Sequence, residues 1–307
     1  MSKAQRIREM NARQRIAAQQ AAARKAETRR RLFLAGGSVL AVIAIVVGLI
    51  VAKTVGSGSA TSGGGTATAA EVSQVSDKIT TVPASTLNAV GAGTGVSHLL
   101  PTQGNPATLT SGGKPEILYV GAEYCPYCAA ERWAMVVALS RFGTFSNLKL
   151  IHSSGTDVYP NTPTLSFYKS SYTSQYLDFE PVEWYGTKPA AQQGAYKTLQ
   201  VPTSAQMALF TKYDAPPYVQ STNQSGSFPF VDIGNKYLVI GAQYVPSNLA
   251  HLSWAQVATD IRDPSSAVAK EIDGTANSIT AAICKVVPNA PAAVCNSPAA
   301  QAGAGSL

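Results

Sequence analysis

The chain has 307 residues, a formal net charge of +7, four cysteines and three histidines. Residues 1–31 hold ten Lys or Arg against two Glu, whereas residues 32–307 hold fourteen basic and fifteen acidic residues, so the positive balance lies in the N-terminal tail. Because this tail has no aromatic residue that could stack on a base, the composition argues against nucleic acid as a partner.

The first predicted element is a single transmembrane helix at residues 32–53. Leu32–Ala52 contains 21 residues without a charge, and a helix of this length spans about 31 Å, close to the hydrocarbon thickness of a bilayer. Because the basic tail of residues 1–31 precedes the span, we expect a single-pass cell-membrane protein with a cytoplasmic N-terminus and an extracytoplasmic C-terminal part. The rival interpretation is a signal peptide cleaved within Val55–Ala60.

The next segments lead from the membrane to the outer domain. Residues 54–70 are almost all Gly, Ser, Thr and Ala, which is typical of a flexible linker. The extracytoplasmic domain is predicted at residues 71–295. Its first part, Glu71–Gly113, is interpreted as an arm packed on the domain, with a short helix near Ser85–Val90.

A C-x-x-C motif follows a short buried strand predicted at Ile117–Val120. After Cys125-Pro126-Tyr127-Cys128 the apolar residues recur at helical spacing, and Pro126 suits a first helical turn. Cys125 is therefore expected at the N-cap, where unpaired backbone N–H groups and the helix dipole lower the pKa of a thiol. We predict that Cys125 is the catalytic nucleophile and that Cys128 is the resolving thiol.

The same spacing also suits half of a zinc site. The other two cysteines, Cys284 and Cys295, lie about 160 residues downstream, and the three histidines are scattered singly without an H-x(3 to 5)-H pair. The sequence therefore favours redox chemistry over a structural zinc site. Neither a metal nor an organic cofactor is predicted.

Several segments resemble known families. The turn Ala122–Cys125 followed by a helix resembles the active-site turn of thioredoxin-fold oxidoreductases, and Cys-Pro-Tyr-Cys is typical of glutaredoxins. The run Lys114–Phe145, together with Asp157–Pro160 and Phe228–Asp232, resembles the membrane-anchored thioredoxin-like family catalogued as domain of unknown function 929. The resemblance covers roughly Val82–Lys285 and implies an α/β, thioredoxin-like fold with an insertion.

The resemblance also implies a cis-proline that begins a strand and lies against the cysteines. Pro229 is the candidate, and Val201-Pro202 is the competing position. A strand at Phe230–Ile233, a tight turn at Gly234-Asn235 and a returning strand at Lys236–Ile240 are then expected. A proline at the start of a strand is also tolerated without a cis bond, so that alternative stays open. The residues expected to bind the substrate are Phe228, Pro229, Tyr124 and Tyr127.

One position departs from the family pattern. Many thioredoxin-like enzymes place a buried acid six residues before the first cysteine, where it relays protons to and from the resolving thiol, and here that residue is Tyr119. We expect slower exchange, or a relay through water or Tyr119. Glu123 lies nearby and is expected on an exposed turn.

The active-site helix is expected to end near Phe142-Gly143, and Leu148–His152 is predicted to be the second strand of a β-α-β unit. Residues 155–225 are predicted to be an insertion rich in aromatic residues. These residues could line a lid over the cysteines or form an ordinary small core, and the sequence does not choose between the two.

The C-terminal part is predicted to contain two helices, Asn248–Ile261 and Ser265–Cys284. Cys284 and Cys295 have ten residues between them, and outside the cytoplasm they are expected to form a structural disulfide. A second redox pair is the alternative. Residues 296–307 are small and polar and are predicted to be a disordered tail.

These features predict a membrane-anchored, extracytoplasmic thiol-disulfide oxidoreductase that acts on polypeptide thiols or disulfides through Cys125 and Cys128, in exchange with a membrane redox partner. The alternative is a non-catalytic cell-envelope binding or assembly module. In that alternative the thioredoxin-like fold is kept and the same two cysteines form a structural disulfide.

Overall fold

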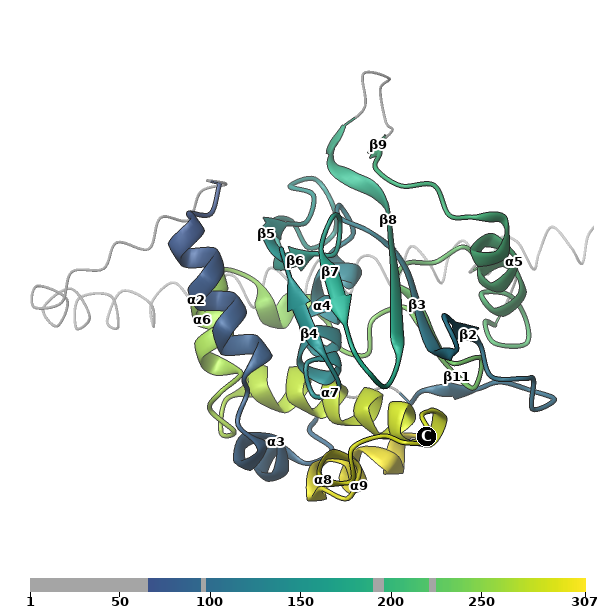
Figure 1. The fold of residues 1–307 in the computed structure, drawn as a ribbon. Coiled ribbons are helices and arrows are strands. Elements are labelled where there is room, and N and C mark those ends of the chain that lie inside the picture. The colour runs from purple at the N-terminus through teal and green to yellow at the C-terminus, as the bar shows by residue number, and fades with distance from the viewer. Residues whose placement is uncertain (1–65, 95–97, 190–195, 221–224) are drawn as a thin grey trace, which may run out of the picture. The chain divides into compact units, whose positions relative to one another are not determined.

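The computed structural model describes residues 66–94, 98–189, 196–220 and 225–307 (Figure 1). The predicted basic tail, transmembrane helix and most of the linker lie outside these residues. Within the described ranges, no helix has both the length and the apolar character needed to cross a bilayer. The described part is a mixed α/β structure, as the sequence predicts. Its first helix, α2 (Ala69–Thr80), begins inside the last residues of the predicted linker.

A seven-stranded mixed sheet forms the centre of the domain. Its order is β1-β11-β10-β3-β8-β9, and β2 pairs with the start of β3. The strands are β1 (Leu100–Pro101), β2 (Thr110–Ser111), β3 (Lys114–Ala122), β8 (Asp178–Pro189), β9 (Tyr196–Thr198), β10 (Phe230–Ile233) and β11 (Tyr237–Ile240).

The parallel pair of this sheet is β3 with β8, in a register that sets Glu116 opposite Asp178. The crossover between them contains α4 (Pro126–Leu139) and two small two-stranded sheets. The predicted role of Leu148–His152 as the parallel partner is wrong, because β5 (Lys149–His152) pairs antiparallel with β6 (Pro163–Ser166) outside the central sheet. The other small sheet joins β4 (Thr144–Ser146) to β7 (Ser171–Thr173).

The placement of β8 also corrects the predicted insertion at residues 155–225. This strand lies next to β3 in the middle of the sheet, so the segment contains a structural strand and not only an added lid. Local sequence does not reveal this place in the sheet, because a strand buried between neighbours is specified by its partner strands more than by its own residues.

The predicted hairpin near the C-terminus is confirmed. β10 and β11 pair antiparallel around the Gly234-Asn235 turn, and β10 also pairs antiparallel with β3. Pro229 lies directly before β10, and the Phe228–Pro229 peptide bond is cis. The competing Pro202 instead precedes α5 (Ser204–Tyr213), whose N-cap is Thr203.

Side chains of β3 alternate between two cores, as the period of a strand requires. Ile117 and Tyr119 face the larger core, which α4 and α7 (Ala267–Val286) help to form. Leu118 and Val120 face the smaller core, which α5 covers through Phe210 and Tyr213 (Figure 1). The sheet is therefore covered on both faces.

The remaining helices surround the larger core. They are α3 (Ala84–Val90), α6 (Trp254–Asp260), α8 (Ala292–Cys295), α9 (Pro298–Gly303) and the short turns η2 (Pro246–Leu249) and η3 (Ala304–Ser306). The helix expected near Ser85–Val90 is confirmed as α3. The predicted Asn248–Ile261 helix is split into η2 and α6, because a capping box of Ser253 and Gln256 starts a new helix.

The prediction of a disordered tail at residues 296–307 is wrong. Ala299 and Ala300 of α9 are buried, and a Cβ added to Gly303 would lie 2.2 Å from the carbonyl oxygen of Asn277 in α7. The small residues that suggested disorder are thus the ones that let α9 pack closely on α7. Before this tail, Cys284 and Cys295 form the predicted disulfide, with their Cα atoms 5.6 Å apart.

Candidate active site

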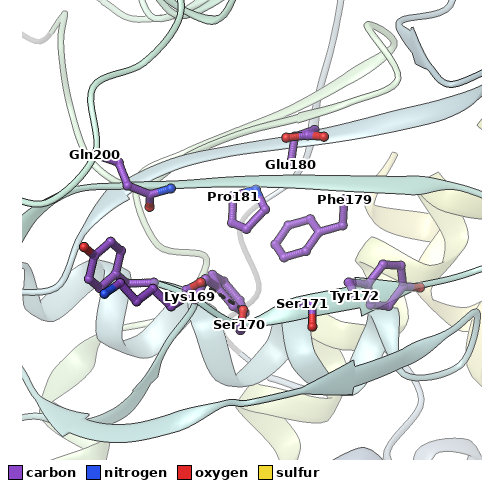
Figure 2. A pocket seen from close by; sticks show the side chains of 10 residues that line it. Lys169, Ser170, Ser171, Tyr172, Phe179, Glu180, Pro181 and Gln200 are labelled. Atoms are coloured by element: carbon purple, nitrogen blue, oxygen red, sulfur yellow. Dashed lines mark hydrogen bonds between the residues drawn. The ribbon is translucent and has the colours of Figure 1, made fainter.

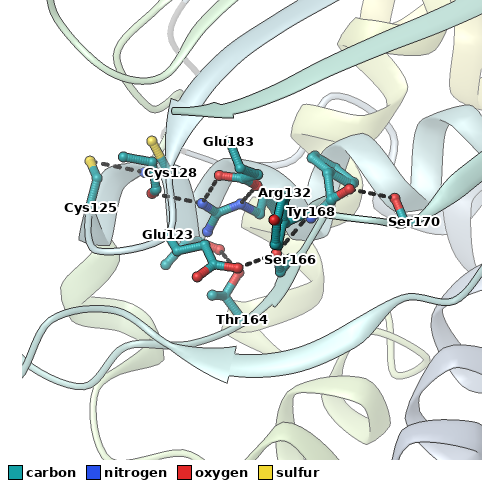
Figure 3. Close-up of polar contacts among 12 residues, drawn as sticks. Glu123, Cys125, Cys128, Arg132, Thr164, Ser166, Tyr168, Ser170 and Glu183 are labelled. Carbon is teal, nitrogen blue, oxygen red and sulfur yellow. Dashed lines mark hydrogen bonds and ion pairs between the residues drawn. The ribbon is translucent and has the colours of Figure 1, made fainter. Parts of the chain in front are cut away.

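The two cysteines of the C-x-x-C motif lie where β3 ends and α4 begins (Figure 3). Cys125 is the N-cap of α4, and its Sγ accepts a hydrogen bond of 3.4 Å from the backbone N–H of Cys128. Pro126 is the first helical residue, where a missing N–H removes no helical bond. The predicted strand-to-helix placement is therefore confirmed. Cys125 is 7% exposed and Cys128 is fully buried, and both are free thiols.

The two thiols differ in acidity. The pKa of Cys125 is lowered chiefly by a hydrogen bond from the Cys128 thiol; the backbone N–H groups of Cys128 and Tyr127 and the charge of Arg132 also lower it, while burial opposes them. The pKa of Cys128 is raised well above its usual value, first by burial and then by its interactions with Cys125. Cys125 is therefore the more acidic thiol and the one with a surface open to solvent.

Phe228 and Pro229 lie beside the more acidic thiol. The Cys125 thiol donates to the Phe228 carbonyl oxygen at 3.8 Å, and Phe228 packs against the small cluster that holds both cysteines. Pro229 is buried at the start of β10. Because β10 is the immediate neighbour of β3, the sheet brings residues about 100 positions apart in sequence to the same point.

The other two predicted substrate-binding residues, one just before the motif and one within it, make separate aromatic contacts. The Tyr124 ring stacks on Tyr196, with centroids 4.0 Å apart. Tyr127 is exposed and meets the Tyr159 ring edge to face at 5.8 Å. An aromatic rim, defined as Tyr124, Trp184, Tyr185, Tyr196 and Phe228, is connected by successive ring contacts next to Cys125.

The aromatic residues of segment 155–225 fall into two groups, one beside the cysteines and one in the larger core. Trp184, Tyr185 and Tyr196 belong to the aromatic rim. Phe167 and Phe179 instead belong to the larger core. The sequence indicates the aromatic richness of this segment but not which of its rings lie beside the cysteines, because their position depends on the pairing of β8 with β3 and β9.

A buried ion pair lies one helical turn below the resolving thiol, and no sequence pattern pointed to it. Arg132 Nε and Nη2 donate to the two carboxylate oxygens of Glu183 at 2.7 and 2.8 Å, and Nη2 also donates to the Ala122 carbonyl at 2.7 Å (Figure 3). Both side chains are fully buried. The i, i+4 spacing from Cys128 to Arg132 on α4 was the available signal, but Glu183 comes from β8.

Tyr119 occupies the position of the expected buried acid. Its side chain is fully buried, and its hydroxyl has no hydrogen bond of good geometry among the described residues. Its pKa is raised well above the usual value, first by burial; the Arg132 charge lowers it, and interactions with Cys128 and Glu183 raise it. The phenol therefore lies close to both the resolving thiol and the ion pair.

Glu123 is not on an exposed turn, as the sequence suggested. It is partly buried, and its carboxylate accepts a 2.5 Å hydrogen bond from the Ser166 hydroxyl of β6. Burial is the main cause that raises its pKa, while the bond from Ser166 lowers it. The antiparallel pairing of β6 with β5 brings Ser166 to this position, which a local pattern cannot reveal.

A separate pocket of about 310 Å³ lies between the segment Phe167–Tyr172 and Phe179–Pro181 of β8 (Figure 2). Its lining is aromatic and polar and contains no cysteine. Gln200 lines this pocket and also contacts a residue of the ion pair. Its side-chain oxygen accepts a 2.8 Å hydrogen bond from the backbone N–H of Glu183.

The described ranges contain no group of three or more His, Cys, Asp or Glu side chains placed to hold a metal ion. His152 packs on the Trp254 ring with centroids 4.2 Å apart, and His98 and His251 are exposed.

Comparison with protein families identifies a family for this chain. The model of a domain of unknown function, DUF929, matches residues 101–285. The chain belongs to the DUF929 family. The match includes both cysteines of the motif, Pro229 and Cys284, and it starts later than the Val82 expected from the resemblance. The name of this family specifies no activity. No curated protein and no solved structure matches the chain.

Proposed function

We propose that the domain is a thiol-disulfide oxidoreductase with a thioredoxin-like fold. The support for the fold is the order and direction of four strands, β8-β3-β10-β11, with β3 and β8 parallel and the others antiparallel. The helix α4 connects the parallel pair, and α7 follows the hairpin and packs on α4. A β-α-β unit followed by a hairpin and a helix is the arrangement that a thioredoxin-like fold would have.

The proposed activity is supported chiefly by the difference in pKa and in burial between the two thiols. A dithiol enzyme needs one accessible sulfur that ionises readily and a second one that stays protonated until it is required. Cys125 has the lowered pKa and retains 7% of its surface exposed, whereas Cys128 has the raised pKa and is fully buried.

In the reducing direction, the Cys125 thiolate attacks one sulfur of a substrate disulfide, the S–S bond breaks, and the departing sulfur takes a proton. Cys128 then loses its proton and attacks Cys125 Sγ, and the substrate sulfur leaves with the electron pair and a proton. The enzyme dithiol is oxidised and the substrate disulfide is reduced. The oxidising direction is the same sequence in reverse.

The substrate is a polypeptide, and it lies against the aromatic rim. Phe228 and Pro229 present backbone beside Cys125, and Tyr124, which precedes the motif, and Tyr127, which lies within it, contribute apolar ring surface. Such rings bind extended chains through apolar contact while their hydroxyls face water.

The proposed location is the outer face of the cell membrane. It follows from the uncharged run Leu32–Ala52 and the basic residues before it. A membrane redox partner that returns Cys125 and Cys128 to their starting oxidation state fits this location. Protease accessibility of the domain in intact cells, compared with that of the basic N-terminal tail, tests the orientation.

The test of the activity is capture of mixed disulfides. Cells that express the Cys128→Ala variant are quenched in acid, and disulfide-linked adducts are separated by non-reducing electrophoresis. We expect adducts that disappear on reduction and in the Cys125→Ala, Cys128→Ala control. Adducts at the level of that control would refute the oxidoreductase.

One observation favours the alternative of a binding or assembly module: the two cysteine residues expose little surface, with Cys125 at 7% and Cys128 at 0%. In that case Cys125 and Cys128 would form a permanent structural disulfide. The reduction potential of the pair separates the two functions, because structural disulfides have potentials below about −300 mV and catalytic ones have higher values.

A further inference from the structure

The Tyr119 hydroxyl reaches its position through an adjacent glycine. Tyr119 and Gly121 point to the same face of β3, and a Cβ added to Gly121 would lie 2.2 Å from the Tyr119 hydroxyl oxygen. The phenol therefore fills the space that a side chain at residue 121 would occupy. This places a buried hydroxyl without a well-formed hydrogen bond near Cys128.

A second buried donor comes from the ion pair. The Arg132 side chain donates two hydrogen bonds to Glu183 and one to the Ala122 carbonyl. Its Nη1 has no hydrogen-bond partner among the described residues. The guanidinium carbon is 6.0 Å from the centroid of the Tyr119 ring. A hydroxyl and a guanidinium N–H, neither with a hydrogen-bond partner among the described residues, thus lie close together on the buried side of the motif.

Buried donors without acceptors cost free energy in the resting protein, unless an anion forms beside them in another state. We propose that Tyr119 and Arg132 are positioning residues for Cys128, which stabilise its thiolate during resolution and replace the buried acid of related enzymes. The inference rests on the proposed function. The chemical difference is that a hydroxyl and a guanidinium stabilise the anion, whereas a carboxylate would remove the proton.

The protons of the resolution step balance without a further base. The Cys128 S–H bond breaks, the S–S bond to Cys125 forms, and the bond between Cys125 and the substrate sulfur breaks with its electron pair on the substrate. The proton from Cys128 ends on that departing sulfur. Tyr119 and Arg132 stay protonated throughout.

The charges around Cys128 change in the direction that this step needs. While Cys125 is a thiolate, its charge and its hydrogen bond with Cys128 both add to the effect of burial and raise the pKa of Cys128. Once Cys125 is bonded to a substrate sulfur, these two contributions vanish, but Arg132 still lowers that pKa and Glu183 still raises it. Cys128 therefore becomes more acidic when its thiolate is required.

The experiment measures the ionisation of Cys128 directly. In a Cys125→Ser background, isotopically labelled Cys128 is the one free thiol, since the other two cysteines form a disulfide. Its Cβ chemical shift is followed against pH by NMR. Tyr119→Phe should move the midpoint up by about one pH unit, a tenfold loss of thiolate below the midpoint. Tyr213→Phe, another buried tyrosine but in the smaller core, is the matched control and should not move it.

A second variant should shift the titration midpoint of Cys128 in the opposite direction. Glu183→Gln removes the charge that opposes Arg132 and should move the Cys128 midpoint down, provided that circular dichroism shows a folded domain. An unchanged midpoint in Tyr119→Phe, or an upward shift in a folded Glu183→Gln variant, would overturn the inference. The titration uses no substrate, so its failure is distinct from a failure to capture mixed disulfides, which rejects the oxidoreductase.

Discussion

Replacing Arg132 by methionine tests whether the buried ion pair is part of the folded framework of the site. The Arg132→Met variant removes three hydrogen bonds of 2.7–2.8 Å and leaves the Glu183 carboxylate fully buried. The strongest contact that remains for this carboxylate is a 3.3 Å bond from the Phe167 backbone N–H. Removing one partner of a buried pair costs about 3–5 kcal/mol, because the other charge is left without compensation.

For a domain of this size, that loss corresponds to a decrease in Tm of about 6–20 °C. The assay is thermal unfolding of the disulfide-intact protein, followed by circular dichroism. The double variant Arg132→Met, Glu183→Gln leaves no buried charge and should recover about 2 kcal/mol or more of the loss.

The matched control is Arg141→Met. Arg141 donates to the neutral side chains of Asn277 and Ser297, so its removal leaves no buried charge and should cost only about 1 kcal/mol. The reasoning would be refuted if Arg132→Met cost no more than this control, or if the double variant were as unstable as Arg132→Met alone.

Two further predictions concern groups outside the site. Asp273 on α7 is fully buried, neither carboxylate oxygen has a hydrogen-bond partner among the described residues, and burial raises its pKa to about 8. Because this folded-state pKa lies above the unfolded value of about 3.9, its contribution to stability is complete below pH 4 and is lost as the pH rises towards 8. In urea unfolding, Asp273→Asn should therefore be at least about 1 kcal/mol more stable than the wild type at pH 8, with no such gain at pH 4; equal effects at both pH values would contradict the assignment. Replacing Cys284 and Cys295 by serine should cost about 2–4 kcal/mol of stability and leave the alkylation rate of Cys125 unchanged. A changed rate would indicate instead that the two cysteine pairs exchange electrons.

Local sequence was sufficient for the elements whose determinants lie within a few residues. The placement of Cys125 at the start of a helix follows from a short apolar strand, Pro126 and the helical spacing after it. The Gly234-Asn235 hairpin and the Cys284–Cys295 disulfide also follow from short-range spacing. In each of these, turn geometry, capping or loop length decides the outcome.

The predictions failed where the deciding partner is distant in sequence. The parallel partner of β3 is β8 and not Leu148–His152, because the chain forms two small antiparallel sheets before it returns to the centre. The tail at residues 296–307 was expected to be disordered because small residues bury little area. These residues are buried because Gly303 has no Cβ, which lets α9 approach α7 closely, and the sequence alone does not show that α7 lies there.

The sequence by itself determined that two cysteines meet at a strand-to-helix junction, that this junction is followed by one helix, and that residue 119 before it is a tyrosine and not an acid. Only the tertiary structure decided what surrounds the sulfurs: Glu183 paired with Arg132, the rim of Tyr185 and Tyr196, and the space at Gly121 that the Tyr119 hydroxyl fills. The physical reason is that a helix N-terminus is a property of consecutive residues. The dielectric, the charges and the hydrogen-bond donors around a buried thiol are instead set by strands that the fold brings together from across the chain.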